Sequence, residues 1–266
     1  VVSTMGIGLS MFGAMLVLMA VRVPIAIAMF VPGAVGYLAL AGWLPLLAHL
    51  KGAVYGRVSV YDLSVIPLFM LMGAFAVQGG LSKALFDFAN ALLGRFKGGM
   101  AMAGVLACAA FGSISGSTVA TTATIAQVAY PEMRRINYSG RLATAALATG
   151  GTMGVLLPPS VTLMVYAILT EQNITKMFLA AYIPALLAAV GYLVAIAVVV
   201  RLHPEHAPAA QAATANELVA SALRVWPIAA IFLVVFGGIY GGLFTATEGA
   251  AIGNLMTFAI TLMRGE

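Results

Sequence analysis

Charged residues are scarce in this 266-residue chain, where Asp, Glu, Lys and Arg together make up 8% of the sequence. Ordinary soluble domains contain about 25% of these residues. Apolar residues make up 62% of the chain, and a soluble fold cannot cover that much apolar surface with so few charges. Lipid is the solvent that suits this composition, and the long apolar runs predict an all-α integral membrane protein.

Residues for catalysis are also missing. The single Cys108 excludes an internal disulfide and a cysteine-rich metal site. An intramembrane serine hydrolase would need a His or Lys base, but His49, His203 and His206 lie in connectors and no Lys lies in the middle of an apolar run. No phosphate loop of the form GxxxxGK[ST] occurs. We therefore expect neither an enzyme nor an ATP-driven pump, and no cofactor.

The connector that carries His203, Glu205 and His206 is the one clearly hydrophilic stretch of the chain. These side chains could hold a metal ion or lie free in solvent. The solvated connector is the favoured interpretation, because a third strong ligand in a rigid frame is missing. We expect no transition metal.

Apolar runs of about 20 residues divide the chain into expected membrane crossings. Seven candidate spans cover residues 5–21, 23–42, 63–80, 141–169, 177–200, 226–244 and 248–263. Residues 81–97 instead place apolar side chains every three or four positions between charged ones, which predicts an amphipathic helix at the membrane interface. The start of the chain shows no cleavable signal peptide, because a basic leader is missing.

The basic residues predict the orientation of the spans. When Arg22 is placed in the cytoplasm, only Lys51, Arg57 and Lys176 of the 13 Lys and Arg fall outside. This positive-inside bias puts the N-terminus outside and residue 266 in the cytoplasm. It also explains the net charge of +5 without a nucleic-acid partner, since no basic stripe with interleaved aromatics occurs.

Residues 98–130 are too long for one crossing and too short for two, and both flanks are basic. The sequence therefore predicts a re-entrant helical hairpin that turns inside the membrane at residues 112–118. Backbone groups freed at such a turn must be buried in protein or line a wet cavity. The open helix end suits a carboxylate, and the freed carbonyls suit a small cation. Tight packing of small residues between helices is the alternative.

A second break is expected in the long span 141–169, where Gly150, Gly151, Thr152 and Gly154 precede the pair Pro158-Pro159. Prolines remove backbone donors and disfavour helix at the preceding residue. A simple kink is the alternative to an unwound, ion-lined stretch. All eight acidic residues lie at span ends or in connectors, so the carboxylate relay of a proton-coupled carrier is missing, and Na⁺ is the better coupling ion.

These stretches resemble the large membrane subunit of tripartite ATP-independent periplasmic (TRAP) transporters. The similarity is carried by Ile66-Pro67-Leu68-Phe69, FGSISGSTVATTATIA, Tyr130-Pro131-Glu132-Met133, GTMGVLLPPSVTLMVYAILTEQNITKMFLAAYIPALL and GGIYGGLFTATEGAA. The family usually has Phe-Thr-Pro-Thr-Glu before its last-named span, whereas this chain has Ala246 at the proline position.

The resemblance implies a sodium-coupled importer of organic acids, such as C4-dicarboxylates or sialic-acid-like compounds, in the bacterial inner membrane. The N-terminus would then be periplasmic. The implied partners are a small four-helix membrane subunit, a periplasmic solute-binding protein, lipid and the acid itself. Family members contain two inverted repeats and work as elevators, so this chain resembles the N-terminal three-fifths of a subunit, whose C-terminal remainder is a further partner.

By the same resemblance, the chain divides into parts with different roles. Residues 1–80 are expected to be scaffold, 81–97 the interfacial helix, 98–200 half of the transport domain, 201–225 a cytoplasmic loop and 226–266 the start of a second repeat. The candidate sodium ligands are Gly112, Ser113, Ser115, Gly116, Gly151, Thr152, Gly154 and Pro158. The candidate substrate-binding residues are Ser115, Ser117, Thr118, Pro159 and Ser160. The competing hypotheses are a symporter for divalent anions that needs no binding protein, and a membrane scaffold that transports nothing.

Overall fold

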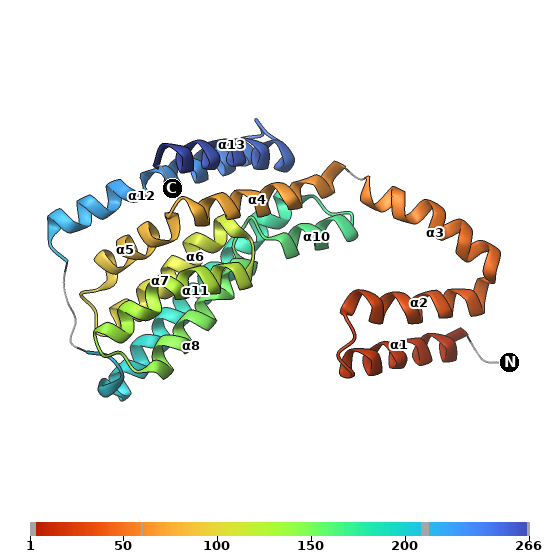
Figure 1. Ribbon diagram of the computed structural model, residues 1–266, viewed down its shortest axis with the longest axis horizontal. Coiled ribbons are helices and arrows are strands. Elements are labelled where there is room, and N and C mark those ends of the chain that lie inside the picture. Colours follow the sequence, from red (N-terminus) through yellow and green to blue (C-terminus); the bar gives the residue numbers. More distant parts are fainter. Residues whose placement is uncertain (1–3, 60, 209–212, 265–266) are drawn as a thin grey trace. The chain divides into compact units, whose positions relative to one another are not determined.

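The computed structural model describes residues 4–59, 61–208 and 213–264. The chain separates into two compact units, residues 1–60 and 61–266. The predicted orientation of the N-terminus and of residue 266, and part of the predicted loop at residues 209–212, lie outside the described residues. Every regular element in the described part of the chain is a helix, which confirms the all-α prediction (Figure 1).

The first unit contains three helices, α1 (Thr4–Ala20), α2 (Ile25–Ala41) and α3 (Trp43–Val58). The chain turns between α1 and α2 at Arg22, whose φ is 66°. Met11 of α1 fits against Gly36 of α2, where a Cβ atom would lie 2.8 Å from the Met11 Cγ. The helix α3 was not among the expected elements, because this stretch is less apolar than the runs on either side.

The second unit holds all the remaining elements. In chain order they are η1 (Tyr61–Ser64), α4 (Val65–Gln78), α5 (Leu81–Leu93), α6 (Gly99–Ser115), α7 (Thr118–Arg135), α8 (Gly140–Gly151), α9 (Met153–Leu156), α10 (Val161–Leu169), α11 (Ile174–Leu202), η2 (Pro204–His206), α12 (Ala215–Tyr240) and α13 (Ala246–Arg264).

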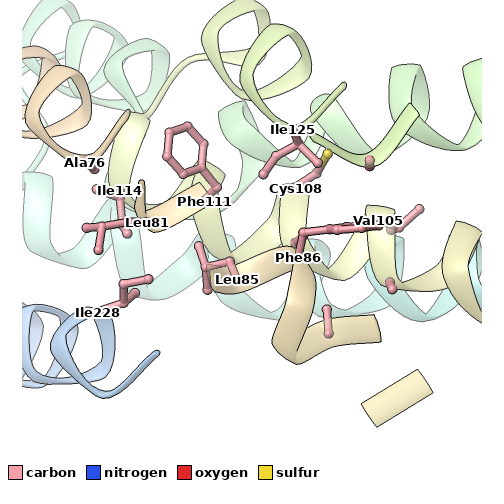
Figure 2. Packing of buried hydrophobic residues seen from close by; sticks show 14 of the residues in the cluster. Ala76, Leu81, Leu85, Phe86, Val105, Cys108, Phe111, Ile114, Ile125 and Ile228 are labelled. Atoms are coloured by element: carbon pink, nitrogen blue, oxygen red, sulfur yellow. The ribbon is translucent and has the colours of Figure 1, made fainter. Parts of the chain in front are cut away.

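The helix α6 is the centre of this unit and packs against α4, α5, α7, α8 and α11. Small residues along its length, among them Ala103, Gly104 and Ala107, are buried and let the neighbouring helices approach closely. Figure 2 shows side chains of α5, α6 and α7 meeting in one apolar cluster, with Phe111 in its middle. A helix that is buried on all sides is expected to be apolar on all sides, as this one is.

Within the described part of the chain, three stretches are long and apolar enough to cross a membrane: residues 140–169, which include α8 to α10, and the helices α11 and α12. The pair α4 and α5 would add a fourth if it were one span, but the two helices are bent by 70°. The helices α1, α2 and α6 are apolar but only 17 residues long. These helices agree with a multi-pass membrane protein.

The predicted amphipathic helix is present as α5, which buries Leu81, Leu85 and Phe86 and exposes Lys83. It ends at Leu93, before Gly94. The apolar face of α5 packs on α6. The sequence predicted that this face would contact lipid. The interfacial position of α5 remains a prediction.

The helix α12 begins at Ala215, well before the expected start of that span at residue 226. A reciprocal capping box causes the early start: the Glu217 amide donates to the Thr214 hydroxyl at 3.3 Å, and the Thr214 amide donates to the Glu217 carboxylate at 2.8 Å. The sequence analysis placed this turn in a loop because its residues are polar. A similar pair, Thr245 and Glu248, caps α13. This cap starts the helix although Ala246 stands where the family usually has a proline.

The helices α4 and α13 lie side by side and run parallel. The Asn254 amide donates to the Leu68 carbonyl at 2.6 Å, and the Thr261 hydroxyl donates to the Phe75 carbonyl at 3.0 Å. Because the two bonds join residues with the same sequence separation of 186, the helices share a direction and a register. In a membrane, such polar contacts add to van der Waals packing as the force between helices.

Candidate functional site

The predicted hairpin is formed by α6 and α7, which meet at a turn of two residues. Gly116 has a left-handed φ of 61°, and its amide closes the end of α6 by donating to the Gly112 carbonyl at 2.9 Å. Ser117 is extended and caps α7 by accepting from the Ala120 amide. The α7 arm returns along α6, since a Cβ atom on Gly104 would lie 3.1 Å from the Met133 Cε.

The turn is shorter than the predicted stretch 112–118, because α6 stays helical through Ser115. The Ser113 hydroxyl donates to the Ala110 carbonyl at 2.7 Å and so supports the last helical turn instead of opening it.

The second break contains two interruptions. The helix α8 ends at Gly151, and one short turn, α9, precedes a non-helical stretch from Leu157 to Ser160. Pro158 and Pro159 have no amide hydrogen to continue the helix. Ser160 then caps α10 by accepting from the Leu163 amide at 3.3 Å. The predicted broken helix is therefore present.

The two breaks are in direct backbone contact with each other. A Cβ atom on Gly112 would lie 2.6 Å from the Gly154 Cα, and one on Gly116 would lie 2.6 Å from the Pro159 carbonyl oxygen. The Val161 amide at the start of α10 donates to the Gly116 carbonyl at 3.4 Å. Only glycine fits at such approaches, so these glycines fix the distance between the hairpin and the second break.

A buried hydroxyl pair lies beside this contact. Ser115 Oγ and Thr121 Oγ1 are 2.7 Å apart, and the Ser117 amide points at Ser115 Oγ at 3.5 Å. Thr121 is fully buried and also touches the Gly154 position, where a Cβ atom would lie 2.8 Å from the Thr121 hydroxyl. Sequence reasoning missed Thr121, although it follows Ser117 by one helical turn and therefore shares its face of α7.

The remaining candidates point elsewhere. Ser113 lines a cavity of about 500 Å³ between α5, α6 and α12, away from the second break. Thr152 is exposed, donates to the Thr149 carbonyl at 2.6 Å and lies 3.0 Å from the Tyr192 hydroxyl of α11. Gly151 faces Thr122 of α7. The structure thus joins one group of candidates and leaves others outside it. The joined group is Gly112, Ser115, Gly116, Ser117, Gly154 and Pro159.

Further members of the predicted set lie at the edge of this group. Thr118 is half-buried at the start of α7, and its carbonyl accepts from the Thr122 hydroxyl at 2.8 Å. Pro158 and Ser160 are buried in the non-helical stretch between α9 and α10. The Ser160 hydroxyl is occupied by its capping bond to α10.

The chemistry of this region is that of helix ends and neutral oxygens. The positive ends of α7 and α10 meet where Val161 reaches the Gly116 carbonyl, and paired helix N-termini attract anions. Hydroxyl and carbonyl oxygens from Ser115, Thr121 and Ser117 lie next to them and suit a small hard cation. No Asp, Glu, Lys, Arg or His belongs to this group of contacting residues.

Comparison with known proteins gives one consistent result. A family model described as "Tripartite ATP-independent periplasmic transporter, DctM component" matches residues 12–266. The chain is 38% identical over 203 residues to the C4-dicarboxylate TRAP transporter large permease protein DctM of Pseudomonas aeruginosa, covering 76% of this chain and 47% of that protein.

Two other relatives give the same family. The chain is 35% identical over 201 residues to the C4-dicarboxylate permease DctM of Vibrio cholerae, covering 75% of this chain and 44% of that protein. It is 32% identical over 238 residues to the 2,3-diketo-L-gulonate TRAP transporter large permease protein YiaN of Escherichia coli, covering 88% and 54%. The chain spans about half the length of the curated relatives it matches.

Proposed function

Since the chain belongs to the DctM family of tripartite ATP-independent periplasmic transporters, we propose that it is part of the large permease subunit of a sodium-coupled importer of organic acids. This family consists of transport components, so the chain is not an enzyme. The observation that carries the proposal is the contact between the hairpin turn at Gly116 and the second break at Pro159. Broken helices that meet in this way mark the ion and substrate sites of secondary transporters.

The sodium assignment rests on the oxygens at this contact. Ser115, Thr121 and the Ser117 carbonyl offer neutral oxygens: the two hydroxyls are 2.7 Å apart, and the Thr121 hydroxyl and the Ser117 carbonyl both lie against Gly154. A buried pair of hydroxyls can turn toward a cation without changing its own protonation state. Sodium bound there would hold α7 against α9 and thereby order the two helix ends that face the substrate.

The substrate would lie at the starts of α7 and α10. A carboxylate matches the positive dipole ends of two helix N-termini better than an amine or a neutral sugar does. The relatives are named for C4-dicarboxylates, 2,3-diketo-L-gulonate, isethionate and ectoine. Each of these relatives' named compounds carries an acidic group, so an organic acid, including a C4-dicarboxylate or a sialic-acid-like compound, is the proposed substrate class of this chain.

The proposed assembly follows from the family. A periplasmic solute-binding protein would deliver the acid, a small four-helix membrane subunit would complete the scaffold, and the remainder of the large subunit would supply a second site. The chain would lie in the inner membrane with its N-terminus in the periplasm. Residues 98–200 would move as half of the transport domain in an elevator mechanism.

Proton coupling is the competing proposal, and Asp87 of α5 is the residue that would support it. Burial raises the pKa of the Asp87 carboxyl, while the positive charges of Lys83 and Arg224 lower it. Asp87 lies on a helix that we expect at the membrane interface, outside the group of contacting residues. Sodium therefore remains the proposed coupling ion.

Uptake into proteoliposomes that contain the assembled transporter tests the proposal. Labelled C4-dicarboxylate should accumulate under an inward Na⁺ gradient with the binding protein present, and K⁺ or a pH gradient should not replace Na⁺. Accumulation driven by a proton gradient without Na⁺ would refute the sodium assignment. Accumulation without the binding protein would favour the divalent-anion symporter, and no uptake of any acid would favour the scaffold.

Two variants locate the site. Ser115→Ala removes one hydroxyl of the buried pair and should weaken the sodium dependence of uptake. Ser221→Ala is the matched control, because Ser221 is also a buried serine on a helix, but it lies on α12 and its hydroxyl donates to the Leu218 carbonyl. Equal sodium dependence in both variants would remove Ser115 from the proposed site.

A further inference from the structure

The short helix η2, directly after α11, brings three metal-binding side chains together. A 3₁₀ helix has three residues per turn, so residues three apart lie on the same side. His203 and His206 have that spacing, and the His206 amide donates to the His203 carbonyl at 3.1 Å. Pro204 at the first position of η2 fixes its backbone.

Glu205 supplies the third ligand. Its Oε1 lies 3.3 Å from the His203 Nδ1, and the two imidazole rings are 5.4 Å apart between centroids. One ligand atom from each of the three residues lies within 4.8 Å of the others. We propose that His203, Glu205 and His206 bind a zinc ion with a water molecule as the fourth ligand.

The distances allow this without moving the backbone. Zinc binds nitrogen and oxygen at about 2.0–2.2 Å, so two ligands at a tetrahedral angle lie roughly 3.4 Å apart. The His203–Glu205 pair already has this separation. Both side chains are more than half exposed, at 58% and 65%, so they have room to turn toward a common centre.

The backbone around the trio is held at both ends, which supplies the frame that the sequence did not reveal. His203 continues the hydrogen-bond pattern of α11, because its amide donates to the Val199 carbonyl at 2.8 Å. The His206 carbonyl accepts from the Ser139 amide at 3.0 Å. Ser139 is the residue that caps α8. A bound ion would therefore fix the end of α11 to the turn between α7 and α8.

The ligand set selects the class of metal. Two imidazole nitrogens with one carboxylate suit zinc and similar transition metals, whereas Mg²⁺ and Ca²⁺ require mostly oxygen ligands. Among the described residues, this is the one group of at least three His, Cys, Asp or Glu that could hold a metal. Cys108 is fully buried, and the third histidine of the chain, His49, lies on α3 in the other unit.

Calorimetric titration of the purified protein in detergent with Zn²⁺ tests the site. We expect saturable binding of one Zn²⁺ per chain, and none when Mg²⁺ or Ca²⁺ replaces it. His203→Ala and His206→Ala should abolish saturable binding, and Glu205→Gln should weaken it. His49→Ala is the matched control and should bind as the unchanged protein does.

A structural measurement separates this site from adventitious surface binding. Zinc should slow hydrogen exchange of the Ser139 amide, because it fixes the His206 carbonyl that accepts from it. The same slowing should be lost in His206→Ala. Undiminished zinc binding in both histidine variants, or unchanged exchange at Ser139 in the zinc-bound protein, would overturn the proposal. The four substituted residues, His49, His203, Glu205 and His206, lie outside the proposed transport site. Failure of the zinc proposal would therefore leave the sodium proposal unaffected.

Discussion

Gly112→Ala is the substitution that tests the contact between the two breaks most directly. The added Cβ atom would lie 2.6 Å from the Gly154 Cα and 2.9 Å from the Gly154 nitrogen. Ordinary van der Waals contact begins at 3.4 Å, so α6 and α9 must separate by about 0.8 Å. Both atoms belong to the backbone, and no side chain can turn away to relieve the clash.

The expected cost follows from two opposing effects. Overpacking of this kind costs about 1–3 kcal/mol, while replacing glycine by alanine inside a helix gains up to about 1 kcal/mol. The net loss of about 1–2 kcal/mol corresponds to a factor of about 5–30 in an equilibrium constant. If sodium binds between hairpin and break, this factor should appear in the sodium concentration that half-saturates uptake.

The assay is uptake by the assembled transporter at graded Na⁺ concentrations, with Gly104→Ala as the control. Gly104 lies on the same helix, but its added Cβ atom would meet only the ends of Leu147 and Met133, each at 3.1 Å. These flexible ends can move, so we expect the sodium dependence of Gly104→Ala to stay near that of the unchanged protein. Unchanged sodium dependence in Gly112→Ala, with protein that folds normally, would refute the reasoning.

Substitutions at three further positions test other parts of the structure. Tyr192→Phe removes the hydroxyl 3.0 Å from Thr152, and hydrogen exchange in α9 should become about fivefold faster, as expected for one hydrogen bond of about 1 kcal/mol. Asn254→Leu should change the melting temperature little, because it removes a bond to Leu68 together with the unpaired buried Asn254 Oδ1, whereas Asn254→Asp buries a charge and should lower it clearly. Asp87→Asn should raise the melting temperature near pH 7, because burial raises the pKa of the Asp87 carboxyl and its charged form therefore opposes folding. The difference from the unchanged protein should disappear as the pH falls through the raised pKa to the ordinary value of 3.8, where Asp87 is itself neutral.

The hairpin illustrates what the sequence could predict. Its length, its two basic flanks and the cluster of Gly and Ser required a turn near residues 112–118, and the structure has that turn at Gly116 and Ser117. The exact position depends on hydrogen bonds that the pattern does not encode. Ser113 bonds back to Ala110 and extends α6, so a serine that appears to break a helix supports it here.

Contacts between segments that are far apart in the chain could not be predicted from the sequence. Thr121 joins the buried hydroxyl pair only because α7 folds back beside α6 and α9. Thr152, a candidate sodium ligand by resemblance to the family, lies 3.0 Å from the hydroxyl of Tyr192, which follows 40 residues later. The pattern of a single segment shows which residues break a helix, but the packing of the helices decides which broken ends face each other.

The packing of α4 has a consequence for any elevator movement. Gly73 of α4 lies so close to the hairpin that a Cβ atom there would be 2.9 Å from the Ser115 Cα. The same helix is bonded to α13 through the Leu68 and Phe75 carbonyls, and it belongs to the compact unit that begins at residue 61. A helix joined on two faces cannot slide past either neighbour by several ångströms without breaking these contacts, because packed interfaces shift between discrete arrangements. In an elevator movement, α4 would therefore travel with the hairpin and α13, although it falls within residues 1–80, the part that we expect to be scaffold.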